Sequence, residues 1–154
     1  MRSRLPTGFD RALHRYLDER KPPEWFEGHV PDPKTWSRRG ESEPAAPAAG
    51  SLLSGSAVSG GRASGPARVI RDPNDPRGLE PGEVLVCAIT DPSWTPLFLT
   101  AAAVVCDSGA MQSHAAIVAR ELGIPAVLSV PAITAVGDGT MLHVDRDAGT
   151  VRVG

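Results

Sequence analysis

The stretch that most constrains the fold of this 154-residue chain spans residues 107–130 and reads DSGAMQSHAAIVARELGIPAVLSV. It follows an apolar run, and Ser113 stands where a helix N-cap is expected. Gly123, before Pro125, predicts the end of that helix. The order is therefore strand, tight turn and helix, with His114 in the first helical turn. The unpaired N–H groups of a first turn stabilise an anion, so this position suits a phosphorylated imidazole.

Composition narrows the class of protein. With 41% hydrophobic and 22% charged residues, a chain of this length fits one globular domain with a modest appendage. A net charge of -2 gives no basic surface for nucleic acid or an acidic membrane. No stretch approaches the ~18 apolar residues of a membrane span, and the N-terminus lacks the apolar core of a signal peptide. We therefore expect a cytoplasmic protein that binds neither nucleic acid nor a membrane.

The cysteines and the remaining histidines predict no bound metal. Cys87 and Cys106 each lie inside an apolar run and form no CxxC pair. Buried, reduced thiols are therefore favoured over a disulfide or a zinc site. His14, His29 and His143 have no ligand partner at metal-binding spacing.

Residues 1–37 are predicted to form an N-terminal arm outside the main domain. Apolar residues recur at helical spacing over 9–20, which predicts a short amphipathic helix that ends at the two prolines that follow. Residues 24–36 place three aromatic side chains among prolines, which is typical of an irregular segment. These side chains either pack on the chain's own domain or form a docking surface for a partner. Residues 38–50, rich in Pro and Ala, are predicted to be a linker.

The main domain, residues 51–154, alternates strand-like and helical patterns. Strands are predicted over 52–58, 67–70, 84–89, 104–106, 126–128, 141–144 and 150–153, with helices over 93–102 and from His114 to the glycine at 123. The glycine-rich loop 59–65 has neither the GxxxxGK[ST] nor the GxGxxG pattern, so a turn between strands is favoured over a phosphate site. The pattern predicts an α/β fold in which helices cover a mixed sheet.

Two motifs and the C-terminus carry a family resemblance. The motifs are TDPSWTP, which starts at Thr90, and GAMQSHAAIVARELGIPAV, which starts at Gly109; the C-terminus continues the match with GTVRV. Together they resemble the swivelling phosphohistidine domain, or mobile domain, of the phosphoenolpyruvate (PEP)-utilising enzymes. That family includes phosphoenolpyruvate synthase, pyruvate phosphate dikinase and rifampicin phosphotransferase. The resemblance implies a three-layer β/β/α swivelling fold.

The resemblance also implies roles for individual residues. His114 would be the nucleophile that carries a phosphoryl group from a nucleotide-binding domain to a second site. Ser113 would cap its helix, and Gly109 would allow the sharp turn after the strand. Gln112 would orient the imidazole in place of the Thr of the dikinases and synthases. Arg120 would support the loop or meet a partner's phosphate, and an ion pair with a nearby carboxylate is an equal alternative.

Several positions depart from the family pattern. Ala110 stands where a second glycine is usual, so we expect an ordinary φ there. Ser129 replaces a glycine common after Pro-Ala-Val, and Gln112 puts Thr-dependent control in doubt. None of these changes removes the nucleophile. Trp94 matches a family motif, and it either shapes the face beside the phosphohistidine or belongs to the core or the start of a helix.

A complete phosphotransferase also needs a nucleotide cradle and Mg²⁺ ligands, and this chain has neither a P-loop nor a recognisable acidic pair. We therefore expect a stand-alone phosphocarrier that binds no cofactor itself. A separate ATP-grasp protein would use ATP or phosphoenolpyruvate with Mg²⁺ to phosphorylate His114, and an acceptor-substrate subunit would receive the group. The layout would be that of a split PEP-synthase-like, rifampicin-phosphotransferase-like or phenylphosphate-synthase-type system. The alternatives are a non-catalytic interaction or regulatory module and a detached fragment of a longer enzyme.

Overall fold

The computed structural model describes residues 20–21, 28, 32–38 and 45–154. The chain divides into two compact units, Met1–Pro44 and Ala45–Gly154. Each unit is described here by itself, and the second contains all the residues that the sequence identifies as a candidate site.

The described part of the first unit is a small paired element. Strands β1 (Arg20–Lys21) and β2 (Ser37–Arg38) pair antiparallel, and a 3-10 turn, η1 (Pro33–Thr35), precedes β2. The helix predicted over 9–20 lies outside the described residues except for Arg20, which is in a strand. Arg38, the first residue of the linker predicted over 38–50, pairs with Arg20.

The second unit is built on one eight-stranded sheet in the order β3-β10-β9-β5-β6-β7-β8-β4. Its strands are β3 (Leu52–Ser54), β4 (Ser56–Ser59), β5 (Arg62–Val69), β6 (Val84–Cys87), β7 (Ala103–Cys106), β8 (Ala126–Leu128), β9 (Met141–Asp145) and β10 (Thr150–Val153). The strand β5 pairs antiparallel with β9 through its first half and parallel with β6 through its second. One strand therefore belongs to both halves of the sheet.

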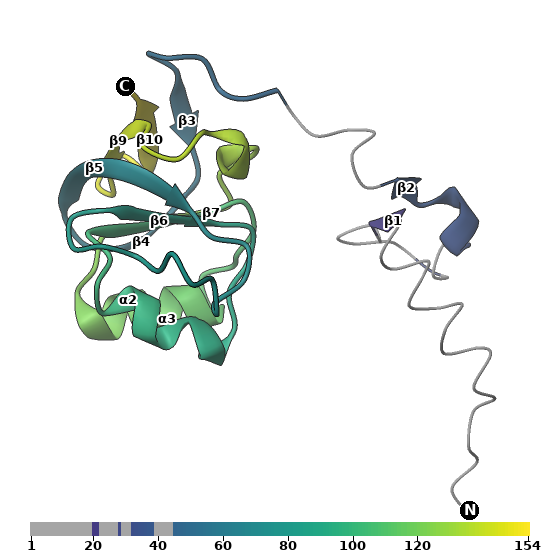
Figure 1. The fold of residues 1–154 in the computed structure, drawn as a ribbon, viewed down its shortest axis with the longest axis horizontal. Coiled ribbons are helices and arrows are strands. Elements are labelled where there is room, and N and C mark those ends of the chain that lie inside the picture. The colour runs from purple at the N-terminus through teal and green to yellow at the C-terminus, as the bar shows by residue number, and fades with distance from the viewer. Residues whose placement is uncertain (1–19, 22–27, 29–31, 39–44) are drawn as a thin grey trace, which may run out of the picture. The chain divides into compact units, whose positions relative to one another are not determined.

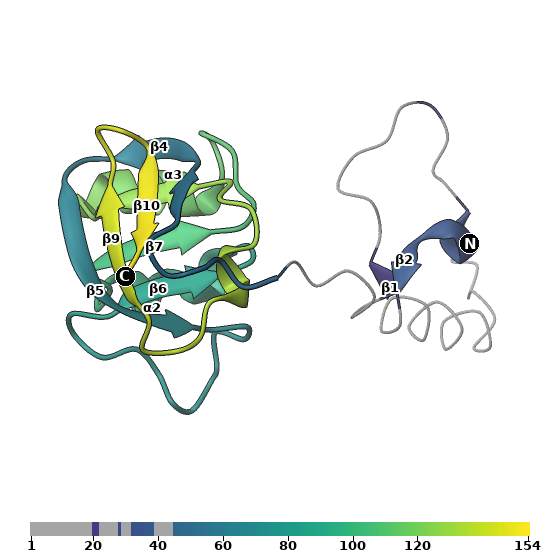
Figure 2. The same ribbon diagram turned by 90° about the horizontal axis from the view of Figure 1, so that it is seen from above.

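The two halves of the sheet and the helices form three layers (Figures 1 and 2). Every residue of β6 and β7 is buried, as expected for parallel strands that are covered on both faces. One core cluster lies between the parallel half and the helices, and a second lies between the parallel half and the β3-β10-β9 half. The predicted α/β fold with β/β/α layers is therefore confirmed.

The helices differ in how well the sequence predicted them. The helix α3 (His114–Leu122) begins after Ser113 and ends at Gly123, whose φ of 67° is left-handed, as predicted. The helix predicted over 93–102 is shorter. It consists of η2 (Pro92–Trp94) and α2 (Thr95–Phe98), because Ala102 already donates its backbone N–H to Glu83 at the start of β7.

Three strand predictions were wrong in their bounds. The strand predicted over 52–58 is two strands, β3 and β4, which separate at Gly55 and lie at opposite edges of the sheet. The loop predicted over 59–65 is only a turn at Gly60 and Gly61, because β5 begins at Arg62 and pairs with β9. The strand predicted over 84–89 ends at Cys87, and Ile89 is 64% exposed. The predicted strand over 126–128 and the C-terminal hairpin of β9 and β10 are confirmed.

The two cysteines pair across neighbouring strands without a disulfide. Cys87 and Cys106 lie opposite each other on β6 and β7, and their sulfur atoms are 3.3 Å apart. Both thiols are free and buried, as predicted. The hydrogen bond with the Cys106 thiol and burial raise the pKa of Cys87, so this thiol stays protonated.

Candidate functional site

His114 lies where the loops after two neighbouring parallel strands meet. The chain leaves β6 toward Thr90 and α2, and it leaves β7 through residues 107–113 toward α3. Because β6 and β7 pair in parallel, their carboxyl ends lie at the same edge of the sheet. This topology brings the segment 90–98 against the first residue of α3.

Two threonines hold the two ring nitrogens of His114. The Thr90 Oγ1 atom lies 3.1 Å from Nδ1, and the Thr95 Oγ1 atom lies 3.3 Å from Nε2. The Thr95 hydroxyl donates its proton to the Pro92 carbonyl, at 2.9 Å. It therefore accepts from Nε2–H, which leaves Nδ1 to accept from the Thr90 hydroxyl. For a neutral ring, this network corresponds to the Nε2–H tautomer.

The imidazole also rests against the core. The Phe98 ring meets it edge-on, with ring centroids 5.9 Å apart and planes at 75°. Phe98 is fully buried, whereas His114 is half-buried. The ring is therefore fixed on one side by α2 while part of it remains accessible to solvent.

Ser113, the helix cap, forms a side-chain hydrogen bond, whereas Gln112 before it forms none with the described residues. The Ser113 side chain accepts from the backbone N–H of Ala116, at a long 3.4 Å. The exposed Gln112 side chain makes no hydrogen bond with the part of the chain that the structure describes. The groups that orient the imidazole are instead Thr90 and Thr95, which sequence reasoning did not select. Both threonines lie in the TDPSWTP motif, which was the signal that could have identified them.

Arg120 reaches back from α3 and holds the loop before the helix. Its guanidinium donates to the Met111 carbonyl at 2.8 Å and to the Val58 carbonyl at 3.2 Å. Among the described residues it forms no ion pair with a carboxylate. The contacts of Arg120 therefore join α3, β4 and the loop, and this cation is not directed at the imidazole.

The same loop is held at its other end by Ser129. The Ser129 hydroxyl donates to the Gly109 carbonyl at 2.6 Å. Ser129 itself has a φ of 56°, which accounts for the glycine usual at this position. Ala110 does not take a positive φ, as expected. A Cβ atom at Gly109 would lie 3.0 Å from the Leu128 side chain, so a larger residue there would push against β8.

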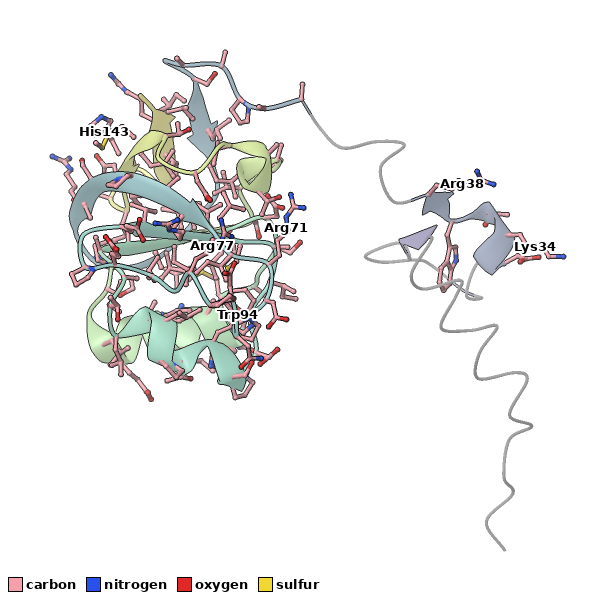
Figure 3. The ribbon with its side chains drawn as sticks, in the orientation of Figure 1. Lys34, Arg38, Arg71, Arg77, Trp94 and His143 are labelled. Carbon is pink, nitrogen blue, oxygen red and sulfur yellow. The ribbon has the colours of Figure 1, made fainter. Side chains whose placement is uncertain are left out.

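Trp94 lies in the core rather than on the face of the site. It is 4% exposed, ends η2 and packs in the cluster between the sheet and the helices (Figure 3). Asp91 caps η2 by accepting from the Ser93 backbone and hydroxyl. These hydrogen bonds, the Ser93 hydroxyl first, lower the pKa of the Asp91 carboxyl, and proximity to His114 contributes. Asp91 therefore caps η2, the short helix that ends directly before Thr95.

Two hollows of the second unit lie away from His114. A hollow of about 610 Å³ lies between the β5–β6 loop and residues 134–138, and another of about 470 Å³ lies around His143 on the outer half of the sheet. His114 lines neither. The described residues hold no group of three or more His, Cys, Asp or Glu placed to bind a metal. Within the same residues, no helix has the length and apolar character to cross a bilayer.

A family comparison agrees with this geometry. The sequence model of the family described as PEP-utilising enzyme, mobile domain, matches residues 79–149. That span includes Thr90, Thr95, His114 and Arg120. Over residues 79–149, the chain resembles the mobile domain of the PEP-utilising enzymes. The matched segment contains the parallel strands β6 and β7 and the helix α3, which begins at His114.

Relatives of the mobile domain occur within much longer proteins. An uncharacterized phosphotransferase, YvkC of Bacillus subtilis, is 48% identical over 100 residues, which are 64% of this chain and 12% of that protein. The phosphoenolpyruvate synthase of Aeropyrum pernix is 41% identical over 128 residues, which are 77% of this chain and 16% of that protein. The crystal structure of Thermococcus kodakaraensis aconitase X (holo-form) shares the fold, with a TM-score of 0.55 and 22% identity over 68% of this chain and 99% of that one.

Proposed function

We propose that this mobile domain is a phosphocarrier in which His114 accepts a phosphoryl group from an ATP- or PEP-utilising partner and passes it to an acceptor. The observation that carries the proposal is the placement of the His114 ring. It stands in the first turn of α3, and Thr90 and Thr95 hold its two nitrogens. A structural histidine would need neither the exposed edge nor the anion-stabilising helix terminus.

The chemistry needs a neutral ring that can attack phosphorus. The lone pair of one nitrogen forms the N–P bond while the P–O bond of the donor breaks, and its electron pair leaves with the nucleotide or with the enolate of pyruvate. Positive charge develops on the ring, and the other nitrogen, as N–H, donates to its threonine. The helix terminus favours the new phosphoryl oxygens. The reverse attack by an acceptor oxygen or water returns the neutral imidazole.

Donor and acceptor chemistry belongs to partner domains in this proposal. The described residues hold no cluster of three or more His, Cys, Asp or Glu placed to bind a metal. The relatives from Bacillus and Aeropyrum extend far beyond the shared segment, which makes up 12% and 16% of their lengths. An ATP-grasp domain would supply nucleotide and Mg²⁺, and a second domain would hold the acceptor.

One observation favours a second candidate, a non-catalytic interaction or regulatory module that keeps the swivelling fold. Gln112 replaces the Thr that orients the histidine in dikinases and synthases, and it makes no hydrogen bond with the described residues. In that case partner binding would be the function, and His114 would remain unmodified. A His114→Ala variant would then keep its effect on the partner.

Phosphosite mapping under alkaline conditions tests the two candidates, because histidine phosphoramidates are lost in acid. The protein would be co-expressed with a candidate ATP-grasp partner and supplied with ATP or phosphoenolpyruvate. We expect one added phosphoryl group that is labile to acid and absent from His114→Ala. The matched control is His143→Ala, which removes an exposed histidine from β9 and should keep the modification. Absence of the group from the wild-type protein beside an active partner would refute the carrier function.

A further inference from the structure

The outer half of the sheet presents a polar face that the proposed carrier function does not use. Side chains of β9 and β10 alternate between buried and solvent-facing positions, so one face of this half packs on the second core cluster and the other faces solvent. The hollow of about 470 Å³ lies on the solvent face, and small-ligand sites typically have about 300–1,000 Å³. Figure 3 shows His143 there, on the side of the second unit away from the helices.

The strand register brings the polar side chains of this hollow together. His143 on β9 lies opposite Ser64 on β5 and opposite Arg152 on β10. Two residues further along β9, Asp145 lies opposite Arg62 on β5. All five residues line the hollow. Because Cβ atoms of directly opposed residues are about 4.5–5.5 Å apart, polar groups of three strands meet within one small area.

Two hydrogen-bond donors of this hollow have no partner within the described part of the chain. The Ser64 hydroxyl lies 2.7 Å from Nδ1 of His143, and when it donates to Nδ1, the neutral ring carries its proton on Nε2. Nε2 then offers an N–H that no described residue accepts. The Arg152 guanidinium likewise forms no hydrogen bond or ion pair with the described residues. A guanidinium beside an imidazole N–H suits an oxyanion.

The charges of the hollow also favour an anion. Two arginines and one aspartate line it, which leaves a charge of +1 with His143 neutral, although the whole chain has a net charge of -2. The aspartate, Asp145, already pairs with Arg62 at 2.9 Å. The uncompensated positive charge therefore belongs to Arg152.

We propose that this hollow binds the phosphate group of a small phosphomonoester, with Arg152 and the Nε2–H of His143 as its ligands. A guanidinium alone satisfies the two oxygens of a carboxylate, whereas the three terminal oxygens of a phosphomonoester need a further donor, which the imidazole supplies. The Thr150 hydroxyl, on the same face of β10 as Arg152, adds another. Leu52, opposite Arg152 on β3 and 58% exposed, provides an apolar surface for the organic part of the ester.

NMR titration of the full chain, followed by its backbone amides, tests the proposal. Butyl phosphate is the probe, pentanoate carries the same butyl group on a carboxylate, and inorganic phosphate lacks that group. We expect saturable shifts on β9 and β10 with butyl phosphate and weaker binding of the other two. Arg152→Gln and His143→Phe should each weaken the binding of butyl phosphate roughly tenfold, because a hydrogen bond to a charged group is lost. Arg71→Gln, which changes an exposed arginine outside this hollow, is the matched control and should bind like the wild-type protein.

Three results would overturn the inference. Shifts at residues 115–117 in place of those on β9 and β10 would assign the phosphate to the N-terminus of α3. Equal affinity for pentanoate would make the hollow a carboxylate site, and an unchanged affinity in Arg152→Gln would show that the guanidinium does not hold the phosphate. The inference does not rest on the carrier function, which phosphosite mapping of His114 tests separately, so either can fail without the other.

Discussion

At the scale of single residues, the central observation is that one short segment satisfies both nitrogens of the His114 ring. Thr90 and Thr95 approach it from opposite sides, at 3.1 Å and 3.3 Å. Only Thr95 has its own proton engaged elsewhere, on the Pro92 carbonyl. The two hydroxyls therefore have different roles, with Thr95 accepting and Thr90 donating in the resting protein.

The first prediction concerns these two threonines. Thr90→Val and Thr95→Val should each slow phosphorylation of His114 about fivefold, the equivalent of ~1 kcal/mol for one neutral hydrogen bond. The ¹⁵N chemical shifts of the ring should show Nε2–H in the wild-type protein and a mixture of tautomers in Thr95→Val. Thr150→Val, a β-branched exchange on β10 remote from the ring, is the control. An unchanged tautomer in Thr95→Val would contradict the assignment.

The sequence pointed to His114 and its helix but not to the groups that hold the ring. Ser113, His114 and Gly123 follow one another in a local pattern of cap, first turn and helix end, so the helix was predictable. The contacts of Thr90 and Thr95 depend on the parallel pairing of β6 with β7, which no local pattern encodes. Residues 24 and 19 positions away thus reach the ring only in the folded protein.

At the scale of elements, the loop before α3 depends on a single long side chain. Arg120→Met should lower the free energy of unfolding by about 1–3 kcal/mol, because the Met111 and Val58 carbonyls would lose a charged donor. Arg152→Met is the control, since Arg152 makes no side-chain contact of this kind with the described residues. Urea unfolding measures the free energy of unfolding of both variants. Equal stability of the two variants would show that the Arg120 contacts contribute nothing.

The long β5–β6 loop is held by charges. The Arg77 guanidinium lies 2.6 Å from Asp75 and 2.7 Å from Asp138, and Arg68 lies 2.7 Å from Glu83. The side-chain hydrogen bonds from Arg77 come first among the causes that lower the pKa of the Asp75 carboxyl, from 3.8 to about 2. A lowered pKa means that the folded protein favours the ionised carboxylate more than the unfolded chain does.

That shift sets the sign of a pH dependence. The contribution of Asp75 to stability is fully present above its unfolded pKa of 3.8 and is lost as the pH falls toward about 2. Arg77→Gln should therefore be less stable than the wild-type protein at neutral pH, and the difference should shrink between about pH 4 and pH 2. Arg152→Gln, which changes an exposed arginine on β10 that forms no ion pair with the described residues, is the control. A difference that stays constant down to pH 2 would contradict the linkage.

At the scale of the whole second unit, β5 joins the two halves of the sheet. Gly65 sits where the pairing passes from β9 to β6, and a Cβ atom there would collide with the Gly82 carbonyl. Gly65→Ala should therefore cost about 1–3 kcal/mol, as overpacking does, or more if the backbone must shift. Gly137→Ala is the control, because its nearest neighbour would be 3.8 Å away and its φ is not positive. Thermal unfolding distinguishes the two.

The same strand shows why part of the fold was not predictable. The glycines and serines of residues 59–65 are typical of a turn, and most of this stretch is nevertheless a strand. Its pairing partner β9 lies far along the chain, at residues 141–145, so tertiary pairing overrides the local preference. The buried runs of β6 and β7 were predictable because parallel strands covered on both faces are continuously apolar.

The engagement of Arg120 with two carbonyls has a consequence for energetics. Because the Arg120 guanidinium is bound to backbone carbonyls, it would not neutralise the negative charge of a phosphoryl group on His114. The threonine hydroxyls and the N-terminus of α3 would stabilise that charge instead. The phosphoryl group on His114 would then keep a high group-transfer potential. Transfer of the phosphoryl group from His114 to a partner pocket rich in cations would therefore lower the free energy. Under the proposed function, the partners would decide the direction of phosphoryl transfer, and the domain would serve either direction.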